Sequence, residues 1–336
     1  MKIANFMKSS VFALAAMSVI GFAAPASAQD TKSITTVVKI SGIPWFDRME
    51  TGVTRFAKDN PDMDIRQVGP ATSDSAQQLQ IIQDLVATGV DALAVVPMDP
   101  DILEGILGRA MARGTIIVTH EADNQINTNA DIEAFNNNDY GTALNERLAK
   151  CMGGKGKWTT FVGSLGSRTH MQWVNAGEEN AKKYPGMELV DPNNESFDDA
   201  NGTYEKAKEI LRKHPDLKGF QTSAGNDVLG VGRAIEEAGL AGKVCLVGTG
   251  LPTPSAAYLD SGAITAIGFW DPQKAGMAMN EVAKLMLEGK KITDGMDLGV
   301  EGYEKVTVTP GAGKGLLIVG NGMVLVDKDT YKKYLF

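Results

Sequence analysis

Short apolar runs alternate with longer amphipathic segments along most of the chain. The first run, 35–40, precedes a segment of helical periodicity at 46–58, and a second run, 63–68, precedes another helical segment at 74–88. Strands and helices that alternate through short turns are typical of an α/β fold, with a parallel sheet covered by helices on both faces. Further strands are expected at 92–96, 116–119, 132–135, 159–162, 188–190, 219–222, 244–247 and 264–269.

Two polar stretches interrupt this alternation and divide it into halves of similar element order. They lie at 124–131 and 136–139, and the pattern restarts after them. We therefore expect two similar Rossmann-like lobes with parallel sheets, joined by a hinge at 136–139 and a second crossing at 269–272. A one-faced helix at 273–288 is expected to return to the first lobe. The predicted segments are 31–137 and 271–298 for the N-terminal lobe, and 138–270 and 299–336 for the C-terminal lobe.

Residues 1–28 have the pattern of a secretory signal. Lys2 and Lys8 precede an apolar stretch at 11–24, and small residues end the segment at Ala28. A basic start, an apolar middle and a small-residue exit predict export to the periplasm with cleavage after Ala28. The alternative, a membrane anchor, is disfavoured because the apolar run is shorter than the ~20 residues that span a bilayer.

The charge balance excludes one class of partner. The formal net charge of the chain is −8, and removal of the two lysines of the predicted signal makes it more negative. A basic footprint for nucleic acid is therefore missing from the composition. The hydrophobic share of 43% is ordinary for a globular protein, and the length that follows the signal suffices for two domains.

Two cysteines, Cys151 and Cys245, are present in a chain predicted to enter an oxidising compartment. A fold held mainly by disulfides would need more of them. Cys245 lies within an apolar strand, which favours a buried free thiol. Whether the two cysteines pair is left open.

Motifs for catalysis and for cofactors are weak. The glycine cluster at 153–157 precedes a strand and lacks the Ser or Thr of a phosphate-binding loop, and Gly248-Thr-Gly250 lacks the third glycine of a dinucleotide site. The three histidines do not have zinc-ligand spacing. A nucleophile elbow is also missing. We expect no enzyme activity, no metal and no cofactor.

Polar and aromatic residues follow the ends of predicted strands in both lobes, where open α/β sheets bind ligands. Taken singly, most have simpler explanations: helix capping accounts for Asp227, a favourable charge at a helix start for Asp271, and core packing for Phe46. Together they suit a polyhydroxylated ligand, whose hydroxyls need hydrogen-bonding partners and whose ring carbons need a flat apolar wall. The candidate ligand-binding residues are Lys39, Trp45, Phe46, Glu121, Asp123, His170, Ser223, Asn226, Trp270 and Asp271.

Several segments are similar to a known family. They are Gly69-Pro-Ala-Thr72, Gln80-Ile-Ile-Gln-Asp-Leu85, Gln172-Trp173, Leu246-Val-Gly248, Gly268-Phe-Trp-Asp271, Gly320-Asn-Gly-Met-Val-Leu325 and 331–336. Through them the chain resembles the periplasmic sugar-binding proteins of ABC importers, of the ribose-binding type I family, in the branch with rhamnose- and autoinducer-2-binding proteins. The resemblance implies a monomer of two lobes with three crossings, a ligand gripped between them, and an ABC permease of the inner membrane as partner.

The resemblance also assigns roles to single positions. It implies that Lys39 donates to the ligand, that Glu121 replaces the family's hydroxyl-accepting aspartate, and that Trp270 and Asp271 contact the ligand at the third crossing. The chain departs from the autoinducer-2 pattern at Thr169-His170 and at 223–225, and from the pentose pattern at Ala122, which follows Glu121. A different sugar or polyol is therefore expected, because unpaired buried polar groups are unfavourable.

These observations predict an exported binding protein that captures a sugar or sugar-like ligand for import. Within this class the alternative is an autoinducer-2 receptor. The sensor half of a sugar-responsive transcription regulator would need an N-terminal pair of DNA-binding helices where this chain has a signal. A secreted glycoside hydrolase would need a pair of catalytic carboxylates, which the sequence does not suggest.

Overall fold

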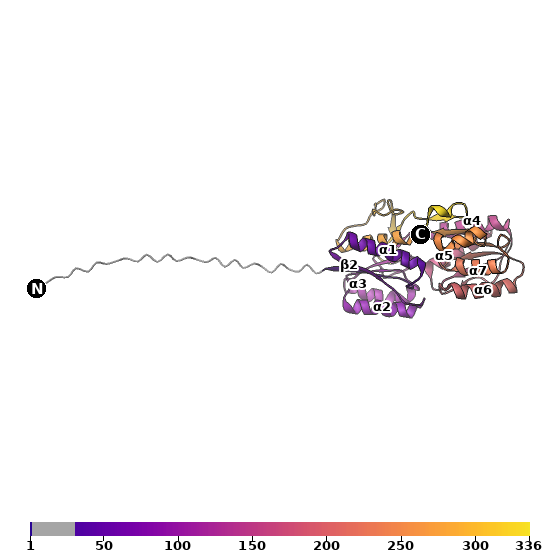
Figure 1. Ribbon diagram of the computed structural model, residues 1–336. Coiled ribbons are helices and arrows are strands. Elements are labelled where there is room, and N and C mark those ends of the chain that lie inside the picture. The colour runs from indigo at the N-terminus through magenta and orange to yellow at the C-terminus, as the bar shows by residue number, and fades with distance from the viewer. Residues whose placement is uncertain (2–30) are drawn as a thin grey trace. The chain divides into compact units, whose positions relative to one another are not determined.

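The computed structural model describes Met1 and residues 31–336, and these form two α/β lobes between residues 32 and 336 (Figure 1). The predicted export signal, 1–28, lies outside the described residues. Each lobe has a seven-stranded sheet, and most neighbouring strands run parallel. The predicted fold class is confirmed.

The N-terminal lobe is built on one continuous sheet with a helix pair on each face. Alternate residues of its strands point to opposite faces, so Leu93 and Val95 pack with one pair while Ala92 and Ala94 pack with the other. Along the sheet the strands are β12 (Thr307–Pro310), β13 (Leu316–Val319), β5 (Ala130–Glu133), β4 (Ile116–His120), β3 (Ala92–Val95), β1 (Lys32–Val37) and β2 (Met63–Val68). The helices are α1 (Pro44–Asp59) with α9 (Pro272–Leu287), and α2 (Ser75–Thr88) with α3 (Pro100–Ala112).

The C-terminal lobe repeats this plan. Its strands are, in order, β14 (Val324–Val326), β11 (Ala266–Phe269), β10 (Cys245–Thr249), β9 (Leu217–Thr222), β6 (Lys155–Val162) and β7 (Gly186–Leu189), with the short β8 (Asn194–Glu195) beside β6. Its helices are α4 (Asn137–Met152), α5 (Arg168–Ala181), α6 (Ala200–Lys213), α7 (Asp227–Glu237) and α8 (Pro252–Ser261), followed by the 3-10 turn η1 (Tyr331–Lys333). Here α4 packs against α5, and α6 against α7.

The chain crosses between the lobes three times. The first two crossings, 134–136 and 270–271, lie close to the predicted positions. The third lies at 320–323, between β13 and β14. It runs beside the first crossing, because Gly322 N donates to the Ala134 carbonyl at 2.8 Å.

One predicted lobe boundary is wrong. We expected residues 299–336 in the C-terminal lobe, but β12 and β13 belong to the N-terminal sheet. They form an antiparallel pair, and β13 lies parallel to β5 with Leu316 opposite Ala130. Only the part from β14 onward joins the C-terminal lobe, where Ile267 pairs with Val326. Short strands in a stretch rich in glycine and proline carry little periodic signal, which explains the error.

Glycines allow two helix pairs to approach closely. A Cβ on Gly141 of α4 would lie 2.3 Å from the Trp173 carbonyl oxygen of α5, and a Cβ on Gly52 of α1 would lie 2.1 Å from the Gln273 carbonyl oxygen of α9. Side chains larger than hydrogen therefore do not fit at either position. The close contact at Gly141 holds α5 against α4. It thereby positions Trp173, which belongs to the candidate functional site.

The two cysteines form a disulfide, which corrects the expectation of a buried free thiol at Cys245. Cys151 lies in the last turn of α4 and Cys245 at the start of β10, and their Cα atoms are 6.0 Å apart. The bond ties a helix to the sheet beneath it and closes a loop with a sequence separation of 94. Sequence could not reveal this pairing, because it depends on which strand the end of α4 covers.

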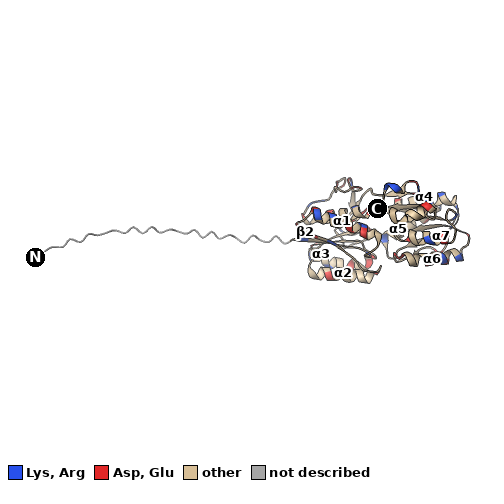
Figure 2. Cartoon of the chain, in the orientation of Figure 1, with Lys and Arg blue, Asp and Glu red and all other residues tan. Residues whose placement is uncertain are grey.

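The surface carries charges of both signs. Acidic and basic residues intermingle along α1, where Asp47 and Arg48 are neighbours (Figure 2). Within the described residues, no helix combines the length and the hydrophobicity that crossing a bilayer requires.

Candidate functional site

A small cavity lies where the two lobes meet, at the carboxyl ends of the central strands of both sheets. This is the edge at which open α/β sheets bind ligands. The cavity has a volume of about 20 Å³, enough for about one water molecule. Its lining consists of Lys39, Ile43, Trp45, Phe46, Glu121, His170, Trp173, Asp198, Ser223, Gly225, Thr249 and Trp270.

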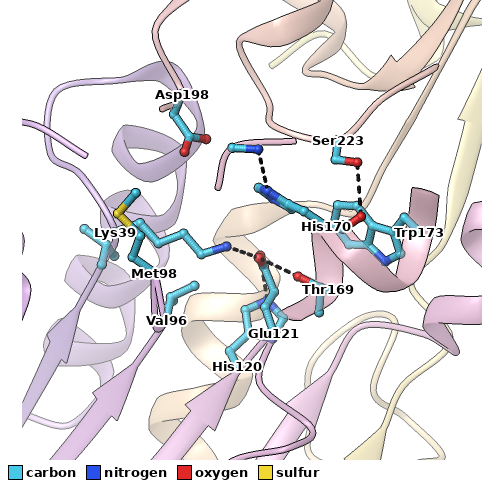
Figure 3. Close-up of polar contacts among 12 residues, drawn as sticks. Lys39, Val96, Met98, His120, Glu121, Thr169, His170, Trp173, Asp198 and Ser223 are labelled. Atoms are coloured by element: carbon cyan, nitrogen blue, oxygen red, sulfur yellow. Dashed lines mark hydrogen bonds and ion pairs between the residues drawn. The ribbon is translucent and has the colours of Figure 1, made fainter. Parts of the chain in front are cut away.

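A buried ion pair forms the N-terminal wall of this cavity. Lys39, just after β1, and Glu121, just after β4, are 3% and 4% exposed. The Lys39 Nζ atom lies 2.6 Å from Glu121 Oε2 (Figure 3). Burial acts to raise the pKa of Glu121, but the net shift is below its usual value, chiefly because the Lys39 ammonium lies beside the carboxylate. The carboxylate is therefore ionised at neutral pH.

The backbone at Glu121 is strained. Its φ is +62°, in the left-handed region that residues other than glycine rarely adopt. Such strain persists only where the surroundings over-determine the conformation, and it is common at ligand sites. In this backbone conformation the side chain of Glu121 turns toward Lys39. Lys39 follows β1, which lies two strands away from β4 in the sheet.

Two buried histidines stay neutral near the ion pair. Burial lowers the pKa of His120, and it lowers the pKa of His170 to about 3. The Gly163 N–H donates to His170 Nδ1 at 3.1 Å, so the proton of the neutral ring is on Nε2. None of the described residues accepts a hydrogen bond from this Nε2–H, and His170 lines the cavity. It therefore offers the cavity a hydrogen-bond donor without a charge.

Three tryptophans supply the apolar part of the wall. Trp45 and Trp270 contact each other edge to face, with ring centroids 4.6 Å apart, and Trp173 lies 5.7 Å from Trp270. Trp45 reaches the opposite lobe because Gly225 has no side chain: a Cβ there would lie 3.1 Å from the Trp45 ring. The indole of Trp173 is fixed by a 2.7 Å hydrogen bond from Nε1 to Asn137 Oδ1. Rings held in this way offer flat apolar surfaces.

Asp198 is the second carboxyl group of the cavity wall. It lies between β8 and α6, is 6% exposed and has a φ of +56°. Its Oδ2 atom accepts one long hydrogen bond, 3.4 Å, from Ser73. Burial raises the pKa of Asp198, which Lys39 partly offsets. Figure 3 shows its carboxylate apart from the Lys39–Glu121 pair.

Contacts outside the cavity hold the lobes together. Asp123 of the N-terminal lobe accepts hydrogen bonds from Arg168 Nε and Gln172 Nε2 of α5, both at 2.6 Å. Thr169 of the same helix donates to Glu121 at 3.3 Å. The lobes are therefore closed on each other, and α5 supplies these three polar contacts.

Seven of the ten candidate residues line the cavity, and three do not. Asp123 instead joins the lobes through α5. Asn226 donates to the Asp198 carbonyl at 2.9 Å, so it supports the wall from behind. Asp271 caps α9 and forms a two-point ion pair with Arg48. In each case the polar atoms are engaged elsewhere. The residues that do line it are Lys39, Trp45, Phe46, Glu121, His170, Ser223 and Trp270.

Two prominent residues of the wall, Trp173 and Asp198, were not among the predicted ligand-binding residues. Trp173 occupies an apolar position of α5, so its pattern indicated packing in the core. Asp198 precedes Asp199, and Asp199 caps α6. One carboxylate is enough to cap a helix, and Asp199 has this role. The additional aspartate, Asp198, could therefore have been recognised from the sequence as a candidate site residue. Ile43, Gly225 and Thr249 complete the lining.

A pair of buried acids lies on β5, beside the first crossing. Asp131 and Glu133 are two residues apart and therefore share a face of the sheet. Asp131 Oδ1 accepts a hydrogen bond from Thr119 at 2.7 Å, whereas Asp131 Oδ2 and Glu133 Oε1 are buried and have no hydrogen-bond partner among the described residues. Burial raises the pKa of Asp131 to about 7, and burial together with Asp131 and Asp123 raises the pKa of Glu133. Asn137, in the first turn of α4, lies near Glu133 and partly offsets the rise of its pKa.

This pair predicts a specific pH dependence of stability. Between about pH 4 and pH 7 the folded protein keeps a proton on Asp131 that the unfolded chain releases, so stability falls as pH rises through that window. Asp131→Asn keeps the acceptor for Thr119 and needs no proton. We expect it to flatten the decline and to increase the free energy of unfolding at pH 8 by roughly 1–3 kcal/mol. Urea unfolding of both proteins at pH 5 and pH 8 measures this.

The control is Asp62→Asn, which neutralises an exposed carboxylate in the turn before β2. It should leave the pH dependence as in the wild type. If Asp131→Asn and Asp62→Asn show the same loss of stability from pH 5 to pH 8, the buried acid pair is not the cause.

The described residues contain no group of three or more His, Cys, Asp or Glu side chains arranged to hold a metal ion. The site therefore consists of one ion pair, one further carboxyl group, neutral hydrogen-bonding groups and aromatic rings. This arrangement is suited to holding a small polar molecule.

Comparison with known proteins agrees with this geometry. Residues 34–291 match the model of the periplasmic binding protein domain, which covers most of the chain. The chain belongs to the periplasmic binding protein family. Among curated members of this family it is 28% identical over 229 residues to the D-ribose/D-allose-binding protein of Pseudomonas aeruginosa, a match that covers 64% of this chain and 69% of the relative.

Solved structures of periplasmic binding proteins share the fold. One is a solute-binding protein of an ABC transporter from Clostridium phytofermentas with bound L-rhamnose, with a TM-score of 0.82, 19% identity, and coverage of 91% of this chain and 98% of that one. Another is LsrB from Clostridium saccharobutylicum in complex with AI-2, with a TM-score of 0.81, 18% identity, and coverage of 90% and 100%. These likenesses establish the arrangement of the two lobes.

Proposed function

We propose that this protein captures a sugar or sugar-like polyol between its lobes and delivers it to an ABC permease. One observation carries the proposal: the strand ends of two sheets converge on a wall of tryptophans, an ion pair and neutral donors. Sugars need such a combination, since their ring carbons pack on aromatic faces while their hydroxyls bond to polar groups. Membership of the periplasmic binding protein family supports the proposal.

The proposed role includes export and a permease partner. The signal pattern at 1–28 favours release into the periplasm after cleavage at Ala28, where the protein acts as a monomer. Relatives named as binding D-ribose, D-allose and L-rhamnose support a carbohydrate as the ligand. The identities are low, so these names suggest the class of ligand and not one member of it.

Ligand capture requires that the lobes separate. A cavity of about 20 Å³ is far smaller than the ~300 Å³ or more of a typical small-molecule site. Three crossing segments join the lobes, and a few residues in such segments can absorb a hinge rotation. Opening would break the contacts of Asp123 and Thr169 across the interface. The ligand would then occupy the space that the tryptophans and Lys39 now fill.

The test is a thermal-shift screen of the protein without its signal, with pentoses, hexoses, deoxysugars, polyols and autoinducer-2. A ligand that binds only the folded state raises the melting temperature. We expect at least one sugar or polyol to do so, with calorimetry confirming a single site. A well-folded protein that responds to no carbohydrate would contradict the proposal.

The autoinducer-2 alternative is an outcome of the same screen. It is favoured by the structural likeness to LsrB in complex with AI-2. The chain has Thr169-His170 and 223–225 where that pattern has other polar residues. A response to autoinducer-2 that exceeds the response to every sugar would establish the alternative.

A further inference from the structure

The charges that line the cavity do not balance. Lys39, Glu121 and Asp198 are the residues of the wall that can carry a full charge at neutral pH, because burial keeps His170 neutral. Burial also raises the pKa of Asp198, so a cation placed beside it would favour the ionised carboxylate. Lys39 is engaged at 2.6 Å with Glu121, so that pair is neutral as a unit. The carboxylate of Asp198 has no such partner. Ser73, a neutral residue, is its hydrogen-bond donor, at 3.4 Å.

Other cations are engaged away from Asp198. Arg168, on the same side of the interface, forms an ion pair with Asp123 at 2.6 Å and does not line the cavity. A proton on His170 Nδ1 would break the hydrogen bond from Gly163, so this ring resists becoming a cation. Asp198 lines the cavity, and its Oδ1 atom accepts no hydrogen bond from the described residues.

The fold holds this carboxylate in place at some expense of conformational energy. Asp198 and its neighbour Phe197 both have positive φ, +56° and +53°. Asn226 anchors the Asp198 carbonyl at 2.9 Å, and a Cβ on Gly163 would lie 2.8 Å from Asp198 Oδ2, so this glycine leaves room for the carboxylate. Two left-handed residues in succession are unfavourable, and such strain is typical of residues that meet a ligand.

We propose that the ligand carries an ammonium group and that Asp198 is the residue that pairs with it; the ligand is then an amino sugar or an amino polyol. This inference rests on the proposed function and narrows it. A neutral hydroxyl would satisfy one hydrogen bond of Asp198 but would leave its charge buried without compensation. An ammonium supplies the hydrogen bond and the charge together, and charge-assisted hydrogen bonds are about twice as strong as neutral ones.

The aromatic wall favours the same ligand. Cations are attracted to the faces of tryptophan rings within about 6 Å, and the attraction is larger where water is excluded. Trp45, Trp173 and Trp270 all line the cavity. One ammonium group next to Asp198 would therefore have a carboxylate and indole rings in its surroundings, while the rest of the ring would bond to Lys39, Glu121 and His170.

Calorimetric titration of matched ligands tests the proposal. The probes are D-glucosamine with D-glucose and N-acetyl-D-glucosamine, D-galactosamine with D-galactose, and scyllo-inosamine with scyllo-inositol. We expect at least one ammonium member to bind tenfold or more tightly than its neutral counterparts at neutral pH. The ratio should fall when the pH is raised above the pKa of the amine, because the neutral amine no longer compensates Asp198.

The variant Asp198→Asn identifies the residue responsible. It keeps an oxygen acceptor of the same shape and removes the charge, so the ratio between ammonium and neutral members should drop toward one. Asp199→Asn, which changes the neighbouring capping residue, is the matched control and should keep the ratio. Circular dichroism and thermal melts of both variants establish that they fold.

The outcomes separate this inference from the proposed function. If neutral sugars bind as tightly as their ammonium counterparts, the protein is a sugar-binding protein and the inference is wrong. If the preference survives in Asp198→Asn, a different group recognises the cation and the assignment to Asp198 is wrong. If no member of any set binds to the folded protein, and the broader carbohydrate screen is also negative, the proposed function fails and the inference fails with it.

Discussion

Replacing Lys39 with methionine is expected to abolish ligand binding and to lower the free energy of unfolding by about 3–5 kcal/mol. Methionine keeps the apolar stem but removes the ammonium, so Glu121 is left 4% exposed; among the described residues the Thr169 hydroxyl then remains as its hydrogen-bond donor, and neutral His120 lies 3.8 Å away. An unpaired buried charge is strongly destabilising, and the site also loses a donor for the ligand.

Urea unfolding measures the loss of stability, and calorimetry with the ligand found by the screen measures the loss of binding. The double variant Lys39→Met, Glu121→Gln removes both charges and should recover most of the lost stability without recovering binding. Lys182→Met, which breaks an ion pair with the exposed Glu179, is the control and should melt like the wild type.

Each part of this prediction can fail separately. Wild-type ligand affinity in Lys39→Met would show that the cavity between the lobes is not the binding site. A single variant as stable as the double variant would show that Glu121 finds another partner, or takes up a proton, when Lys39 is lost.

Removing the disulfide is expected to lower the free energy of unfolding by about 2–5 kcal/mol. The bond between Cys151 and Cys245 closes a loop with a sequence separation of 94, and a crosslink across a long loop restricts the unfolded chain strongly. It also fastens the end of α4 to β10, so its loss frees the last helical turn. Cys151→Ala with Cys245→Ala is the variant to compare with the wild type.

Urea unfolding with and without a reducing agent checks this prediction. Reduction should destabilise the wild type to the level of the double variant and should leave the double variant unchanged. Because both cysteines lie away from the cavity lining, the variant should keep its affinity for the ligand. Equal unfolding curves for oxidised wild type and double variant would show that the bond adds nothing to stability.

The alternation of strands and helices was predictable because it rests on local periodicity. Strand β2 begins and ends at the predicted residues, and α2 begins one residue after its predicted start and ends at the predicted residue. Lys39 and Glu121 were likewise accessible, since each follows the end of a long apolar strand and topology alone brings such ends to one edge.

Features that depend on distant pairing were beyond sequence reasoning. The four-residue strand β13 finds its place beside β5 only in the folded lobe, and nothing near residue 316 indicates that partner. The engagement of Asp123 with α5 depends on how the lobes close, and the same holds for the contact of Trp45 with Gly225. The local hydrophobic pattern of the sequence predicted where strands end, but it did not predict which side chains contact each other in the folded protein.

The third crossing has a consequence for how the protein is made. β5 is synthesised early, but its neighbour β13 forms only after residues 316–319 have been synthesised. In the same way β11 cannot pair with β14 until residues 324–326 have been synthesised. A nascent chain that stops short of residue 307 therefore exposes an unfilled strand edge in each of its two sheets. Exposed edges invite pairing with other chains. Residues 307–326 thus complete both sheets at once, and a chain truncated just before them would keep an open strand edge in each half of the molecule.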